Sequence, residues 1–145
     1  MTNITGADIG IEKKEPESLR SQAARVMRRY FDTLEVNGVL AGYTYEVDRR
    51  CDCFSFVLLE EDGRTVLTDL GDVISGLECD GFEISDDLLK TAADAAKPYG
   101  VTLVGEEIRL ELTPAMTDET IRQYSKALPA VEAACLGFSQ KNGES

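Results

Sequence analysis

The stretch FSFVLLEEDGRTVLTDLG, residues 54–71, decides the fold class of this chain. Its first part, Phe54 to Leu59, is apolar or small on both faces, which is typical of a strand in the middle of a sheet. Glu61-Asp62-Gly63 is a strong hairpin signal, because Asp and Gly accept the backbone conformation of a tight turn. The stretch therefore predicts two adjacent antiparallel strands, with the second running from Arg64 to Thr68.

The residues on the N-terminal side of this hairpin predict a further strand and a helix. Tyr43, Tyr45 and Val47 alternate with polar residues, as in a strand that is wet on one side. A helix is predicted to begin at Pro16 and to end at Asn37-Gly38. Its apolar stripe consists of Leu19, Ala23, Val26, Met27, Tyr30 and Leu34.

The residues on the C-terminal side predict more helices and a second hairpin. Asp72 to Asp80 has the pattern of a short helix or an irregular turn, and Ser85 can cap a helix that follows it. Val101 to Leu112 predicts two short strands, and Thr117 can cap a final helix. The fold class expected from this order is α+β, with a mostly antiparallel sheet of about five strands in two hairpin groups, packed against three helices.

The chain is long enough for one domain with its own core, since 43% of its 145 residues are apolar. We expect a single α+β domain over residues 16–138, a flexible leader over residues 1–15 and a polar tail over residues 139–145. The first ten residues lack a basic stretch followed by an apolar run, and no long apolar run follows them. These features predict a cytoplasmic protein that does not contact a membrane.

The charge of the chain excludes several classes of function. It has 27 Asp and Glu residues against 15 Lys and Arg residues, a formal net charge of −12. Direct binding to nucleic acid or to anionic lipid is not expected, because Lys and Arg supply most of that affinity. The chain has no His, so an imidazole base, an imidazole metal ligand and a His-activated nucleophile are all excluded within one chain.

The segments FSFVLLEEDGRTVLTDLG, VISGLECDGFEI and KPYGVTLVGEEIRLEL carry a family resemblance. In this order they resemble the uncharacterised bacterial and phage family called domain of unknown function 1828, over about residues 24–136. The resemblance includes an acidic hairpin that leads into an LTD-x-G segment, here Leu67, Thr68, Asp69 and Gly71. It implies the order of the secondary structure elements, and it implies no catalytic residue, because the family has no established activity.

The cysteines and the clustered carboxylates are the candidate metal ligands of this sequence. Cys51-x-Cys53 with Cys79 and Cys135 lacks the C-x-x-C spacing of structural zinc sites, so we predict free thiols and no metal. Asp69 and Gly71 are interpreted as a turn in which the Asp side chain accepts from backbone N–H groups two residues on. The alternative is an enzyme that uses Mg²⁺ or Mn²⁺ on a carboxylate cluster: Glu60, Glu61, Asp62, Asp69 and Asp72.

The strongest departure from average composition is an acidic segment from Glu60 to Asp87, in which Arg64 is the only basic residue. It predicts a protein without enzymatic activity or cofactor that binds a basic surface of a nucleic-acid-handling protein, for example as a phage-encoded anti-CRISPR or anti-restriction inhibitor that mimics nucleic acid. The other interpretation is a self-associating accessory domain with a solvated acidic face. The predicted partner-binding residues are Glu60, Glu61, Asp62, Asp69, Asp72, Glu78, Asp80, Glu83, Asp86 and Asp87.

Overall fold

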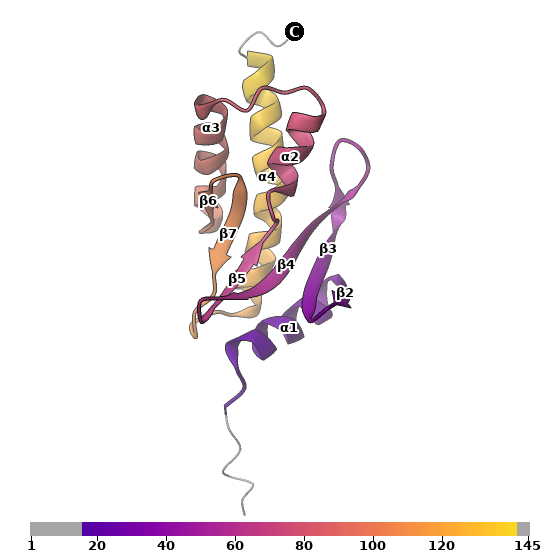
Figure 1. Ribbon diagram of the computed structural model, residues 1–145, viewed down its shortest axis with the longest axis vertical. Helices are drawn as coiled ribbons and strands as arrows, with labels where there is room; N and C mark the ends of the chain where they lie inside the picture. Colours follow the sequence, from indigo (N-terminus) through magenta and orange to yellow (C-terminus); the bar gives the residue numbers. More distant parts are fainter. Residues whose placement is uncertain (1–15, 142–145) are drawn as a thin grey trace, which may run out of the picture.

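The computed structural model describes residues 16–141, and the predicted leader over residues 1–15 lies outside the described residues, as do residues 142–145. Over the described range the chain is α+β, with one six-stranded sheet and four α-helices (Figure 1). The elements in chain order are α1 (Leu19–Tyr30), β2 (Asp32–Val36), β3 (Val39–Val47), β4 (Cys53–Glu61), β5 (Arg64–Thr68), α2 (Asp72–Cys79), α3 (Asp86–Ala96), the 3₁₀ turn η2 (Lys97–Tyr99), β6 (Thr102–Val104), β7 (Glu107–Glu111) and α4 (Asp118–Lys141).

The sheet is antiparallel throughout, with the strand order β2-β3-β4-β5-β7-β6. The predicted central position of the strand over Phe54 to Leu59 is confirmed, because β4 has two strands on one side of it and three on the other. The predicted hairpin is confirmed as well, since Glu61 pairs with Arg64 across the turn. The first four strands follow one another along the chain, and only β7 and β6 exchange their order.

The core lies between one face of the sheet and the helices. Phe54, Phe56 and Leu58 alternate along β4 and are buried against the helices, while the side chains between them are partly exposed on the opposite face. The Phe56 ring packs edge-on against Phe31 at 5.2 Å and against Tyr124 at 5.3 Å between ring centroids. The sheet therefore has one face in the core, and the opposite face, which we call the open face, is partly exposed along β4 and covered at Val66 and Thr68 of β5.

The prediction that the first helix continues to Asn37-Gly38 is wrong. The helix ends at Tyr30, where the backbone N–H of Phe31 donates to the carbonyl of Met27, and the next residues form β2. Asn37 and Gly38 have φ values of 54° and 80°, the positive pair that a tight hairpin turn requires. This turn joins β2 to β3, so the sheet has six strands instead of five, and Leu34 is 55% exposed instead of buried.

Two further elements differ in extent from the expectation. Asp72–Cys79 is a regular helix, which raises the number of α-helices from three to four. The final helix continues three residues past 138, to Lys141, and Ser139 within it is buried. Gly137 lies within α4 and does not end it.

Candidate functional site

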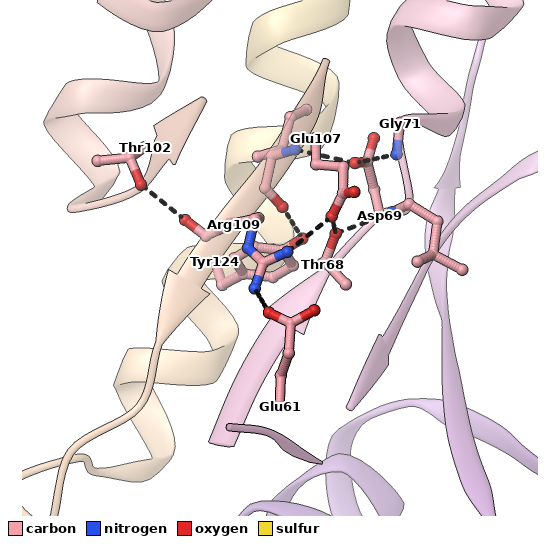
Figure 2. A network of polar contacts seen from close by, with 10 residues as sticks. Glu61, Thr68, Asp69, Gly71, Thr102, Glu107, Arg109 and Tyr124 are labelled. Carbon is pink, nitrogen blue, oxygen red and sulfur yellow. Dashed lines mark hydrogen bonds and ion pairs between the residues drawn. The ribbon is translucent and has the colours of Figure 1, made fainter. Parts of the chain in front are cut away.

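Asp69 connects the end of β5 to the start of α2 and to β7. It is only 3% exposed. Its Oδ1 accepts from the backbone N–H groups of Gly71 at 2.8 Å and Ile108 at 2.9 Å, and its Oδ2 accepts from Val73 N at 3.1 Å. The predicted turn is confirmed, and Figure 2 shows the carboxylate among the backbone groups that it accepts from. Three buried N–H donors are satisfied by one side chain.

The environment of Asp69 shows why it cannot contact a partner. Burial raises the pKa of its carboxyl group above the ordinary value of 3.8, and the N–H groups of Ile108, Val73 and Gly71 oppose that rise. All of its acceptor sites face the interior. Asp69 therefore does not belong to a docking surface, contrary to its place among the predicted partner-binding residues, and it fixes instead where α2 begins.

A chain of polar contacts starts at Thr68, next to Asp69, and joins the ends of β4, β5 and β7 (Figure 2). The Thr68 hydroxyl donates to Glu107 Oε1 at 2.8 Å, and Arg109 donates to the same oxygen at 3.1 Å. Arg109 also forms an ion pair with Glu61 on β4. Behind them, the Tyr124 hydroxyl donates to the Ile108 carbonyl at 2.6 Å. Glu61 is thus paired within the molecule and only partly free for a partner.

The ten predicted acids do not form one surface. Three of them lie at the β4–β5 hairpin, at the end of β5 that is far from α2 (Figure 1). There Glu60 accepts from the Thr65 hydroxyl at 2.6 Å and Glu61 is held by Arg109. Asp62 is exposed at the turn itself. The other acids lie around α2 and α3, so the ten predicted acids are divided into two separate groups.

The second group is the larger one, and we call it the α2–α3 acidic surface. All its members are exposed, and within the described part of the chain none of their carboxylates forms an ion pair or a hydrogen bond. The apolar side of α2, including Ile74 and Leu77, is buried, which turns its acids outward. Ser85 caps α3 by accepting from Leu88 N at 3.1 Å. The α2–α3 acidic surface consists of Asp72, Glu78, Glu83, Asp86 and Asp87.

Arg49, in the β3–β4 connection, holds α2 in place, and sequence analysis did not find it. It forms ion pairs with Asp80, just after α2, and with Glu132 on α4, and it donates to the Gly76 carbonyl at 2.9 Å. Its guanidinium also lies 5.9 Å from the centre of the Phe82 ring. Asp80 is therefore paired internally, unlike its neighbours in the α2–α3 acidic surface.

The carboxylates of the metal-dependent alternative do not lie together in the structure. Among residues 16–141 no three His, Cys, Asp or Glu side chains converge closely enough to hold a metal ion. The carboxylates of that alternative are divided between the hairpin and the start of α2. All four cysteines are free thiols: Cys51, Cys53 and Cys79 are exposed, and Cys135 is buried, which raises its pKa to about 11.

No protein-family model, curated protein sequence or solved structure matches this chain. The resemblance to domain of unknown function 1828 therefore stays a prediction. In the described range 16–141, no helix combines the length and the apolar composition that crossing a bilayer requires. The class that the fold defines is a small α+β domain with an open sheet face, and its candidate site is the α2–α3 acidic surface.

Proposed function

We propose that the protein is a binding module without enzymatic activity, whose α2–α3 acidic surface docks on a basic surface of a nucleic-acid-handling protein. The observation that supports this proposal is the set of five exposed carboxylates on α2, the connection after it and the first turn of α3, with no basic partner in the described chain. Other acids of the molecule are paired, for example Asp80 with Arg49 and Glu61 with Arg109. Further exposed acids without an ion pair, Glu46, Asp52, Asp62 and Glu106, are spread over other elements, whereas five such acids lie together around α2 and α3.

Glu78 gives a second reason to connect this surface with binding. It lies in the last turn of α2, and a carboxylate at the C-terminal end of a helix is unfavourable by a few tenths of a kcal/mol to about 1 kcal/mol. Asp72 and Asp86 lie in first turns, where a negative charge is favourable. Helix stability explains the acids at the two helix starts, but it does not explain Glu78.

The protein is proposed to act by occupying the nucleic-acid site of its partner. Carboxylates presented on a rigid surface can fill a channel of Lys and Arg side chains that otherwise holds phosphates, so nucleic acid is displaced. The opposite charges of the two surfaces also accelerate their encounter. An inhibitor of a CRISPR or restriction nuclease would act in this way, and the protein would need no cofactor and no direct contact with nucleic acid.

The experiment compares two triple variants with the same change of charge. Asp72→Asn, Glu78→Gln and Glu83→Gln neutralise the proposed surface and leave the α3 cap intact. The matched control, Asp32→Asn, Glu35→Gln and Glu46→Gln, neutralises three exposed acids on β2 and β3. Proteins captured from a host lysate by the unmodified chain are purified, and their affinity for all three forms is measured from about 0.05 to about 0.5 M salt.

We expect the surface variant to lose at least about tenfold in affinity at low salt and to show a flatter salt dependence, since each rim charge chiefly changes the association rate. The control should stay within about twofold of the unmodified chain, and short duplex DNA should compete for the captured protein. Equal losses in both variants, or no competition by DNA, would contradict the proposed function.

A further inference from the structure

β2 is a free edge of the sheet. It pairs only with β3, and no other described segment takes up the backbone groups along its outer side. Leu34 and Val36, both on this strand, are each 55% exposed. An exposed edge with unpaired backbone groups and apolar side chains is a template for another strand. This edge has no Pro or Lys to block such pairing.

The opposite edge of the sheet is shorter. β6 has only three residues, and α3 packs beside it. Short strands and covered edges are the usual protections against pairing with a second chain. Val104 on β6 is also 55% exposed, so exposure of an apolar side chain alone does not distinguish the two edges. A helix packs beside each edge strand, α1 beside β2 and α3 beside β6. The length of its backbone edge, five residues against three, is what distinguishes β2.

The charge distribution indicates which partner this edge fits. Residues 16–47, which include α1, β2 and β3, contain four acids and four Arg residues and are neutral. The rest of the described chain, residues 48–141, contains 19 acids and nine bases. Two copies that meet at β2 join neutral regions and keep their acidic regions apart, which minimises the repulsion expected between chains of charge −12.

The strand is also complementary to itself. In an antiparallel pair of two β2 strands with the two-fold axis at Leu34, that residue lies opposite its own copy. Asp32 then lies opposite Val36, and Thr33 lies opposite Glu35, so no two like charges face each other. Glu35 is in addition neutralised by Arg28 of α1, with an N–O distance of 3.0 Å.

We propose that the protein forms a two-fold symmetric dimer through antiparallel pairing of β2 with β2 of a second copy. The two sheets become one continuous sheet, and the two exposed Leu34 side chains meet on its open face, with each Val36 diagonal to Leu34 of the other copy. The dimer does not depend on the proposed function, because the α2–α3 acidic surface takes no part in the contact. It would carry two such surfaces, which favours partners with two basic sites.

The first test measures the mass of the full chain in solution by sedimentation from about 5 to about 200 µM, a range in which mass action separates weak from strong dimers. We expect twice the monomer mass at the upper end, and monomers at every concentration for Leu34→Lys. The matched control is Val104→Lys, an equally exposed residue on the other edge, which should still dimerise. A monomeric unmodified chain at all concentrations would overturn the proposal.

The second test checks the register. Leu34→Cys is made in a chain in which Cys51, Cys53 and Cys79 are replaced by Ser, and air oxidation is followed on a non-reducing gel. Residues directly opposite in an antiparallel pair have Cα atoms about 4.5 to 5.5 Å apart, within the range of a disulfide. We expect a covalent dimer within minutes to hours, and little dimer for Val104→Cys. Equal cross-linking of the two variants would show random collision and would refute this interface.

Discussion

The two free surfaces of this molecule are opposite in character. Residues 16–47 are electrically neutral and expose Leu34, Val36, Tyr45 and Val47, whereas the α2–α3 acidic surface exposes carboxylates. The neutral region is held mainly by apolar packing of α1 under the sheet, while α2 is fixed at both ends by polar anchors, Asp69 at its start and Arg49 at its end. The position of the α2–α3 acidic surface thus depends on buried polar contacts, whereas the neutral region depends on apolar packing.

The largest effect is expected from removing the anchor at the start of α2. Asp69→Ala leaves the N–H groups of Gly71, Val73 and Ile108 without their acceptor in the interior. We expect the free energy of unfolding to fall by about 3 to 5 kcal/mol, because each buried unpaired donor costs about 1 to 3 kcal/mol and the effects are not additive. Urea denaturation of both forms at neutral pH measures this change in the free energy of unfolding.

The control for this anchor is Asp72→Asn, an exposed acid three residues further on, which should change the free energy of unfolding by less than about 1 kcal/mol. A similar loss for Leu34→Ala would remove the contrast between the two regions, since Leu34 is exposed and has no anchoring contact in the structure.

A somewhat smaller effect is expected at the other end of α2. Arg49→Met removes the cation that faces Glu132, whose side chain is only 10% exposed. Because a buried carboxylate without its partner is strongly unfavourable, we expect a loss of about 2 to 4 kcal/mol. Glu132→Leu in the same chain should recover part of it, as it removes the unpaired charge. If the double variant is as unstable as the sum of both single variants, the pair is not coupled in this way.

Single acids of the α2–α3 acidic surface should have small effects of opposite sign. Glu78→Gln removes a negative charge from the C-terminal turn of α2, and we expect about 0.3 to 1 kcal/mol of added stability at low salt. Asp86→Asn removes one from the first turn of α3 and should cost a similar amount. Thermal melts at about 0.02 and about 0.5 M salt test both, and both differences should shrink at high salt. If both variants change the stability in the same direction, repulsion between neighbouring acids dominates over the helix dipole.

The smallest effect concerns the electrostatic potential at the two regions. Cys79 lies between Glu78 and Asp80, whereas a Leu34→Cys thiol would lie in the neutral region. With the other exposed cysteines replaced by Ser, the reaction rate of each thiol is measured with a doubly negative disulfide reagent and with a neutral one. The ratio of the two rates should be about two- to threefold lower at Cys79 than at position 34, because the acids beside Cys79 repel the negative reagent. The difference should vanish near 0.5 M salt. Buried Cys135 should react only after unfolding.

The sheet and the Asp69 turn could be predicted because local chemistry determines them. Phe54 to Leu59 is apolar or small on both faces, which is typical of a strand in the middle of a sheet, and Asp69 with Gly71 has the spacing of a turn closed by a side chain. The burial of Asp69 was missed, because the third donor comes from Ile108, which is distant in the sequence. No local signal marks such a contact.

The error at β2 has a different cause. Asp32 to Val36 alternates at the period of a strand, but Leu34 also continues the helical stripe of α1, so both patterns are present. Asn37-Gly38 can end a helix or form a hairpin turn, and only pairing with β3 decides between them. Arg49 was missed for the same reason as Ile108, since its partners Asp80 and Glu132 lie far along the chain.

The strand order also has a consequence for the kinetics of folding. From β2 to β5 every neighbour in the sheet is a neighbour in the chain, so this meander closes only short loops, whereas β7 must join β5 across α2 and α3. We therefore expect the meander to form in the transition state and the contact between Asp69 and β7 to form after it. In stopped-flow measurements, Asp69→Ala should accelerate unfolding and leave the refolding rate nearly unchanged, and a slower refolding rate would place β7 in the nucleus instead.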